Sequence, residues 1–240
     1  MRWLTAIPVY NEAKSVRDVL AQVREYAPEI LVVDDGSTDG TAKLLDAERG
    51  LHRIRHPRNR GYGAALNSAF DFARKGGYDV LVTMDCDGQH QPDRIPVLLE
   101  QIGDADIVSG SRYLRDFRTD TPAPDDRRSI NATITRELNE QFDLGITDAF
   151  CGFKAYRRNA LCKICASESG WGMPLQVWVQ AARAGLSIRE IAVPRVYLDP
   201  SRAFGGVLND PAERLAYYRT VIETADREAE AAVNCCSETA

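Results

Sequence analysis

The chain has 240 residues, 44% of them hydrophobic, and it carries 30 lysines and arginines against 35 aspartates and glutamates, a formal net charge of −5. This length and composition exclude extensive intrinsic disorder and favour one large globular domain. The acidic balance argues against a general nucleic-acid-binding protein, which would present a basic surface.

Membrane and disulfide signals are weak in this sequence. No apolar run exceeds four residues, whereas a membrane-spanning helix needs about 20. The first residues contain no apolar stretch of signal-peptide length, so we expect a cytoplasmic protein whose six cysteines are thiols. Cys162 and Cys165 have the spacing of a zinc ligand pair. They lie in a helical-looking stretch without a nearby histidine, which argues against zinc.

Short apolar runs alternate with amphipathic stretches over the first half of the chain. The alternation predicts an α/β fold with a mostly parallel sheet and helices on both faces. Sheets of this kind bind ligands beyond the carboxyl ends of their strands, so we expect the loops there to hold the chemistry. Strands are predicted at 4–9, 30–33, 51–55, 80–84 and 107–109, and helices at 14–26, 41–47, 64–74 and 92–102.

The second half begins with a change of composition. Residues 114–129 are rich in Asp, Thr, Pro and Arg, which predicts a long polar loop, and loops of this length are usually functional or mobile. A long helix is predicted at 211–232, followed by a frayed tail. Between these segments we expect helices at 129–142, 157–166 and 174–184, and strands at 150–156 and 188–196.

Polar residues follow the first two predicted strands. Taken singly, they are typical of turns and helix caps. Taken together, they place an aromatic ring, a glutamate and two adjacent carboxylates at one sheet edge. This set suits a nucleoside, since the ring can stack on the base and the carboxylates can accept from its imide or ribose hydroxyls. The residues are Pro8, Tyr10 and Glu12 after the first strand, and Asp34 and Asp35 after the second.

The third predicted strand is bracketed by His52 and His56, which we expect to be structural or surface residues. The sequence PRNRGYG follows it. This is no Rossmann fingerprint, because Leu66 occupies the third glycine position and the motif does not follow the first strand. Arg60 and Gly61 instead indicate cations at a glycine-rich helix start, whose free backbone N–H groups favour an anion. A solvated basic loop leading into a helix is the alternative.

The fourth predicted strand is followed by the sequence DCDGQH. A turn there can bring the carboxylates of Asp85 and Asp87 to one divalent cation, and Gln89 or His90 can add a ligand. Mg²⁺ or Mn²⁺ held by one or two carboxylates and by substrate phosphates is the normal arrangement for a nucleoside diphosphate. A DxD sequence alone is weak evidence, but its place downstream of the paired aspartates strengthens it.

The ordered motifs resemble those of the family 2 glycosyltransferases with the GT-A fold. They are PVYNE, VDDGSTDGT, NRGYGAALNSAF, DCDGQH and GSRY, followed by DAFCGFKAYRR. The last two segments are most similar to those of dolichyl-phosphate mannose or glucose synthases. The resemblance covers roughly residues 4–205. It implies a GT-A domain at 1–205, with a C-terminal helix and tail at 206–240 that belong to the same unit.

The resemblance implies inverting, metal-dependent transfer of mannose or glucose from a UDP- or GDP-sugar to a polyprenyl or dolichyl phosphate. It implies Asp85, Asp87 and Arg112 as catalytic residues, with Asp85, Asp87 and Gln89 around Mg²⁺ or Mn²⁺ and the diphosphate. The donor site is expected to comprise Pro8, Tyr10, Glu12, Asp34, Asp35, Arg60, Gly61 and Asp85. The acceptor phosphate is expected at Arg112, Arg127, Arg128 and Arg202, the last in a segment similar to a mobile acceptor loop.

This chemistry is physically coherent. An acceptor phosphate oxygen is already anionic near neutral pH, so its attack on the anomeric carbon needs no strong general base. The enzyme must instead position two anions and neutralise the departing diphosphate. Two alternatives stay open: a soluble sugar or glycan acceptor, which would require a side-chain base, and a catalytically idle nucleotide-sugar-binding protein.

Two features depart from the family pattern. Gln176 stands where the family usually carries a glutamate, which leaves the acceptor open. Many relatives continue into membrane helices, whereas the helix at 211–232 is amphipathic and predicts a packing or oligomer helix. A lipid acceptor therefore implies a peripheral contact at the cytoplasmic membrane face, and a homodimer stays open. The candidate membrane contacts are Phe117, Phe204 and Val207, with ordinary loop packing as the alternative for these side chains.

Overall fold

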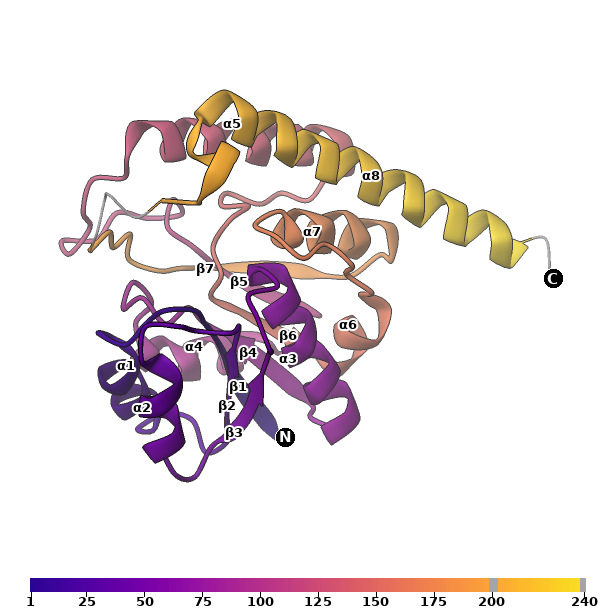
Figure 1. Ribbon diagram of the computed structural model, residues 1–240. Coiled ribbons are helices and arrows are strands. Elements are labelled where there is room, and N and C mark those ends of the chain that lie inside the picture. The colour runs from indigo at the N-terminus through magenta and orange to yellow at the C-terminus, as the bar shows by residue number, and fades with distance from the viewer. Residues whose placement is uncertain (199–202, 238–240) are drawn as a thin grey trace.

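The structure is a computed structural model that describes residues 1–198 and 203–237 (Figure 1). These residues form one seven-stranded sheet with the order β3-β2-β1-β4-β6-β5-β7. Within them, β6 runs antiparallel to both of its neighbours and the other pairings are parallel, which confirms the mostly parallel sheet. The strands are β1 (Trp3–Val9), β2 (Ile30–Asp34), β3 (His52–Arg55), β4 (Val80–Thr83), β5 (Ile107–Ser111), β6 (Lys154–Arg157) and β7 (Ile188–Ala192).

Helices cover both faces of the sheet, as the sequence predicts, because alternate strand residues point to opposite faces. Leu31 and Val33 of β2 join one apolar core, and Ile30 and Val32 join the other. On the second face lie α1 (Val16–Val23), α2 (Thr41–Ala47) and, after the short helix η1 (Pro92–Arg94), α4 (Ile95–Gln101). On the first face lie α3 (Tyr62–Gly76), α6 (Arg158–Lys163) and α7 (Met173–Arg183), with α5 (Asp125–Phe142) and α8 (Pro211–Ser237) packed outside α7.

Helix α8 follows the short helix η2 (Gly206–Asn209) and crosses the molecule beside α5 before extending beyond the body (Figure 1). Its residues Tyr218, Val221, Ile222 and Ala225 are buried in the same core as the strands, which confirms a packing helix. None of the helices in the described part of the chain is both long enough and apolar enough to span a bilayer. Free thiols are found at Cys86, Cys151, Cys162 and Cys165.

Several element bounds differ from the sequence prediction. Helix α5 begins at Asp125 rather than 129, so the polar loop is shorter; acidic residues in its first turn suit the positive end of the helix dipole. Strand β6 begins at Lys154 rather than 150, after a segment in which the carbonyl of Gly152 accepts from the Thr83 hydroxyl. Strand β7 ends at Ala192, two residues before Pro194, which has no N–H for a strand ladder.

The topology gathers chain segments that are far apart in the sequence at one edge of the sheet. Strands β1, β2, β3, β4, β5 and β7 all end there, and antiparallel β6 begins there. Loops after parallel strands meet at this edge, so residues far apart in the sequence can share one site.

Candidate functional site

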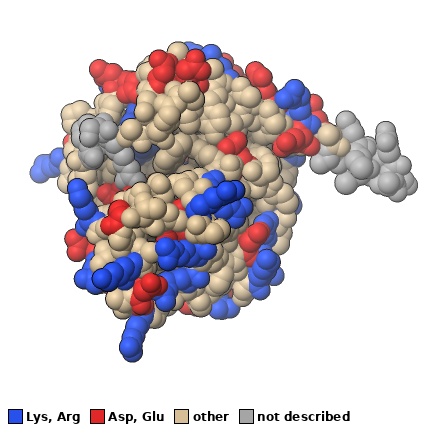
Figure 2. Space-filling model, in the orientation of Figure 1, with Lys and Arg blue, Asp and Glu red and all other residues tan. Residues whose placement is uncertain are grey.

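A cavity of about 760 Å³ lies at this edge. In Figure 2 the surface is hollowed between the upper part, which carries α5 and α8, and the lower part, which carries α1 and α2. We call the side formed by Glu12, Asp35, Asp85 and Asp87 the acidic wall. The side formed by Arg112, Arg127 and Arg214 is the basic wall. The sequence-predicted residues that line the cavity are Pro8, Tyr10, Glu12, Asp35, Gly61, Asp85, Asp87, Gln89, Arg112 and Arg127.

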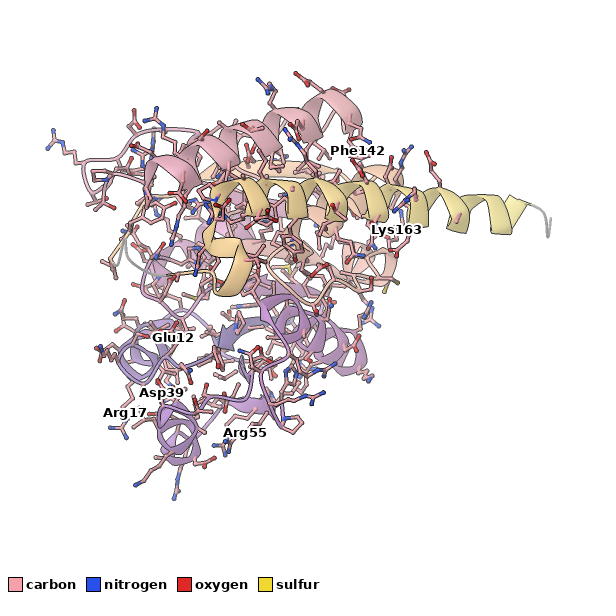
Figure 3. All side chains as sticks on the ribbon, turned by 45° about the horizontal axis from the view of Figure 1, so that its top comes forward. Glu12, Arg17, Asp39, Arg55, Phe142 and Lys163 are labelled. Atoms are coloured by element: carbon pink, nitrogen blue, oxygen red, sulfur yellow. The ribbon has the colours of Figure 1, made fainter. Side chains whose placement is uncertain are left out.

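The first part of the acidic wall is two interlocked loops, which follow β1 and β2. Asn11, in the left-handed backbone region with φ of 57°, donates its N–H to Ser37 Oγ at 2.9 Å. The N–H of Glu12 donates to Thr41 Oγ1 at 2.9 Å. Figure 3 shows Glu12 and Asp39 on these neighbouring loops at one side of the molecule. These bonds hold Glu12 at the cavity.

The carboxylate of Asp35 is nearly enclosed, with 4% of its side chain exposed. Its Oδ1 accepts from the N–H of Arg60 at 3.0 Å, and its Oδ2 accepts from the N–H of Gly61 at 2.8 Å. The Nδ1 of His56 lies 2.5 Å from Oδ1. The structure therefore fills the glycine-rich turn before α3 with a carboxylate of the chain itself.

The start of α3 corrects one sequence prediction. The N–H groups of Gly63 and Ala64 donate to the carbonyls of Gly170 and Ser169, at 3.2 and 3.0 Å. With the two N–H groups bound to the aspartate in the preceding turn, these donors are not free for a ligand anion. The packing is close: Gly61 has a φ of +105°, and a Cβ there would lie 2.3 Å from the Ser169 carbonyl oxygen.

The DxD segment is held from both sides. Tyr62 Oη donates to Asp85 Oδ1 at 2.9 Å, and the N–H of Asp85 donates to His90 Nδ1 at 2.9 Å. Because Nδ1 accepts, the imidazole proton lies on Nε2. Burial, and then the Asp85 charge, raise the pKa of Tyr62 well above its usual value, so its hydroxyl stays a donor. Asp87 Oδ1 accepts from the N–H of Gln89 at 3.0 Å.

These residues fit a hard divalent cation that is also held by a substrate. The oxygens of Asp85, Asp87 and Gln89 are of the type that Mg²⁺ and Mn²⁺ bind. Across residues 1–198 and 203–237, His, Cys, Asp and Glu form no group of three or more able to hold a metal. Gly152 leaves room, since a Cβ there would lie 2.7 Å from Asp85 Oδ2.

Arg112 is fixed in the basic wall by a buried ion pair. Its Nε and Nη2 donate to Asp148 Oδ2 and Oδ1 at 2.7 and 2.9 Å. Asn131 Nδ2 and the N–H of Phe150 also donate to Asp148 Oδ1. Burial raises the pKa of Asp148, but the Arg112 guanidinium outweighs this and holds that pKa at about 2. The other end of the guanidinium approaches Tyr197 Oη, where Nη1 lies at 3.4 Å.

Arg214 of α8 completes the basic wall, and the sequence reasoning missed it. Its side chain pairs with Asp126, and its Nη1 donates to the Leu208 carbonyl at 2.8 Å. The guanidinium carbons of Arg214 and Arg127 lie 4.4 and 5.0 Å from the Phe204 ring centroid. No local motif marks Arg214. In the sequence it is a single arginine at the start of an amphipathic helix, and such arginines are common at protein surfaces.

An aromatic stack joins the two walls. The rings of Tyr62 and Trp171 lie 5.0 Å apart at 16°. Trp171 Nε1 donates to the Phe204 carbonyl at 3.2 Å, and the two rings meet edge to face. Tyr62 bonds to the acidic wall, so a chain of contacts runs from Asp85 to Phe204. In the sequence, Tyr62 stands between two glycines directly after Arg60, a pattern that indicates an anion site and does not by itself mark the tyrosine.

Three other predicted site residues, Asp34, Arg60 and Arg128, lie outside the cavity lining. Asp34 is buried, with Oδ2 3.3 Å from Arg55 Nε. The side chains of Arg60 and Arg128 are exposed and do not line the cavity. Arg202 lies outside the described residues.

Gln176 does not line the cavity. Its side chain is buried, and its Oε1 accepts from the N–H groups of Ser167 and Glu168, both at 2.8 Å. The residue therefore holds the segment before α7. The glutamine that replaces the usual family glutamate therefore stabilises this segment and does not contact the cavity.

The apolar residues considered for a membrane contact are separated in the structure. Val207 is exposed. Phe117 is half-buried between the guanidinium groups of Arg94 and Arg115, and Phe204 lies in the cavity wall. Val207 is therefore the candidate that faces solvent.

Comparison with known proteins adds independent findings. The family model "Glycosyl transferase family 2" matches residues 5–165. The chain is 34% identical to an undecaprenyl-phosphate mannosyltransferase of Micrococcus luteus, over 88% of this chain and 90% of the relative. It is also 34% identical to a polyprenol monophosphomannose synthase of Mycolicibacterium smegmatis, over 80% of this chain and 76% of the relative.

Solved structures resemble the fold. Glucosyl-3-phosphoglycerate synthase from Mycobacterium tuberculosis, solved with Mn²⁺, uridine diphosphate and glucosyl-3-phosphoglycerate, aligns with a TM-score of 0.71 and 17% identity. The alignment covers 93% of this chain and 79% of that one. At this identity the likeness concerns the fold, and it confirms the expected GT-A architecture.

Proposed function

Because the chain belongs to glycosyl transferase family 2 and is a glycosyltransferase, we propose that it moves mannose or glucose from a UDP- or GDP-sugar to a polyprenyl phosphate. The observation that carries the proposal is one cavity with an acidic wall and a basic wall. Such a cavity can hold a sugar diphosphate and an acceptor phosphate together. The printed activities of the two bacterial relatives support the lipid phosphate acceptor.

The nucleoside of the donor lies, in this proposal, against the loops after β1 and β2. The exposed ring of Tyr10 offers a stacking surface beside Pro8, and Glu12 offers a carboxylate to the ribose hydroxyls. Asp35 already accepts from three donors of the chain. Its contact with a base is therefore limited to its remaining acceptor capacity.

The diphosphate lies at Asp85, Asp87 and Gln89, which would hold Mg²⁺ or Mn²⁺. When bound, the cation neutralises charge on the departing diphosphate. Tyr62 keeps Asp85 oriented, and the turn closed by His90 keeps the DxD segment in place.

The acceptor phosphate lies at Arg112 and Arg127, with Arg214 beside them. An anionic phosphate oxygen attacks the anomeric carbon, and a new C–O bond forms while the bond to the diphosphate breaks. The electron pair leaves with the diphosphate. Because the phosphate oxygen attacks the face of the anomeric carbon opposite the diphosphate, this direct displacement inverts the configuration. The arginines position the nucleophile and the chain needs no general base.

A long lipid acceptor requires contact with a membrane. We propose a peripheral contact at the cytoplasmic membrane face, supported by Leu198 and Val207, two exposed apolar side chains. Removal of the apolar side chain of Val207 should then weaken binding to anionic vesicles.

The test is a transfer assay with the purified chain. Radiolabelled UDP-glucose or GDP-mannose is supplied with Mg²⁺ or Mn²⁺, with undecaprenyl phosphate or free mannose as acceptor. We expect label in the organic phase, dependent on lipid phosphate and abolished by EDTA. Label that enters the soluble sugar alone would replace the lipid acceptor with a soluble one. Absence of turnover with every donor would support an idle binding protein.

A further inference from the structure

His56 lies directly behind the acidic wall and is not one of the residues that line the cavity. It follows β3, its N–H donates to the Asp34 carbonyl at 2.9 Å, and 5% of its side chain is exposed. Its Nδ1 lies 2.5 Å from Asp35 Oδ1, and its Nε2 lies 2.9 Å from the Oγ of Ser68 on α3. The ring therefore connects a cavity carboxylate to the helix behind it.

The partners decide where the imidazole proton is. A carboxylate accepts and does not donate, so the proton lies on Nδ1 and is donated to Asp35. With the proton on Nδ1, the other ring nitrogen accepts, and the hydroxyl of Ser68 lies 2.9 Å from it and 3.0 Å from the Ala64 carbonyl, so its single proton is shared between these two acceptors. Both ring nitrogens are thus engaged, which fixes the plane of the ring.

The sequence of contacts Asp35, His56 and Ser68 has the composition of a hydrolase triad, but its geometry does not support nucleophilic catalysis. Ser68 and His56 do not line the cavity, and the serine hydroxyl bonds back to its own helix at Ala64. A nucleophile needs access to its substrate. The triad composition therefore serves a different purpose.

The role of the His56 ring follows from the other groups that bind the Asp35 carboxylate. Its two oxygens accept from the N–H groups of Arg60 and Gly61. The next residue is Tyr62, which donates to Asp85 of the DxD segment. The orientation of the Asp35 carboxylate thus fixes the nucleoside side of the cavity. It also fixes the turn before α3, which positions Tyr62. His56 supplies the third bond to that carboxylate.

We propose that His56 is a positioning residue of the donor site, donating its Nδ1 proton to Asp35 and so holding that carboxylate for the nucleoside of the sugar donor. The inference rests on the proposed function, since it assumes a nucleotide-sugar donor. Removal of a hydrogen bond to a charged, buried group weakens the dependent interaction by about tenfold or more.

Two substitutions separate the two bonds of the ring. In His56→Asn the amide nitrogen replaces Nδ1 and retains the bond to Asp35, whereas in His56→Gln it replaces Nε2 and retains the bond to Ser68. Ser68→Ala is the matched control, because it removes the same bond as His56→Asn. Each folded protein is titrated with UDP-glucose and with GDP-mannose by calorimetry, with Mn²⁺ and without acceptor. His56→Leu replaces His56→Gln if the latter does not fold.

We expect His56→Asn and Ser68→Ala to bind the donor within about threefold of the wild type, and His56→Gln or His56→Leu to bind about tenfold more weakly. In turnover, the weak variant should raise the KM for donor and leave the KM for acceptor unchanged. Equal donor binding by the Asn and Gln variants would overturn the inference, as would a Ser68→Ala defect equal to that of His56→Gln. If the wild type binds neither nucleotide sugar, the proposed function itself fails.

Discussion

The two walls of the cavity are built in different ways. The acidic wall comes from short contiguous motifs on loops after neighbouring parallel strands, and backbone N–H groups make most of its bonds. The basic wall comes from the end of β5, the first turn of α5 and the first turn of α8, held by ion pairs and ring contacts. Topology alone brings the first wall together, whereas the second depends on how distant helices pack.

This difference has a functional consequence. Substitution of Glu12 or Asp87 on the acidic wall should change the use of the donor with little change in stability. Substitution of the buried Asp35 would in addition leave the N–H groups of Arg60 and Gly61 without their acceptor. Substitutions on the basic wall should change stability or the use of the acceptor. Substitutions on each wall can therefore test this division.

The largest effect is expected at Asp87. Asp87→Asn removes one of the two carboxylates of the DxD segment, so turnover should fall by about a thousandfold or more with Mn²⁺ present. Asp93→Asn, an exposed aspartate on η1 outside the cavity lining, is the control with the same charge change. Initial rates and melting temperatures of both variants provide the measurement. Full activity of Asp87→Asn would contradict the metal assignment.

The second effect concerns stability. Asp148→Asn leaves the mostly buried Arg112 guanidinium without its charged partner and should cost about 3 kcal/mol. Asp226→Asn, which disrupts the pair with the more exposed Arg183, should cost under about 1 kcal/mol. Urea unfolding at pH 7 measures both values. A cost equal to that of the surface pair would show that Asp148 does not hold the basic wall.

The same pair makes stability depend on pH. The folded pKa of Asp148 is about 2, below its usual value, because Arg112 outweighs burial. A depressed folded pKa contributes stability that is present above the unfolded pKa of about 3.9 and lost as the pH falls toward 2. Unfolding curves between pH 5 and pH 2 should therefore show a loss of about 2 kcal/mol that is absent in Asp148→Asn.

Two neighbouring arginines of α5 test the acceptor side. Arg127 lines the cavity and lies over the Phe204 ring, whereas Arg128 is exposed outside the cavity lining. Arg127→Ala should raise the KM for the lipid phosphate by about tenfold, because a charged hydrogen bond to phosphate is lost. Arg128→Ala should change it by less than about twofold. Equal effects would show that the charge of the helix matters rather than one guanidinium.

The acidic wall could be predicted from the sequence because its residues come directly after predicted strands that run parallel to one another. The residues from Pro8 to Glu12 and from Asp85 to Gln89 needed only the rule that parallel strands end at one edge. What failed there was the assignment of open N–H groups at Gly61, since the sequence does not show that Asp35 takes them.

The basic wall was predicted only in part. Arg112 and Arg127 came from the family resemblance, and both line the cavity. Arg214 and Trp171 were missed because their position depends on how α8 and the segment before α7 pack on α5 and α3. Neither residue belongs to a local pattern. The start of β6 was also missed, since residues 150–153 are not strand and the Gly152 carbonyl there accepts from the Thr83 hydroxyl.

The smallest effects are expected where the walls meet, at the stacked pair Tyr62 and Trp171. Tyr62→Phe keeps the ring but removes the donor to Asp85, so donor KM should rise about fivefold with acceptor KM unchanged. Trp171→Phe keeps an aromatic ring but removes the N–H bonded to the Phe204 carbonyl, so acceptor KM should rise about threefold. Steady-state kinetics with each substrate varied in turn separates the two. If both variants change both constants equally, the walls act as one unit, and the division between a donor wall set by topology and an acceptor wall set by packing is wrong.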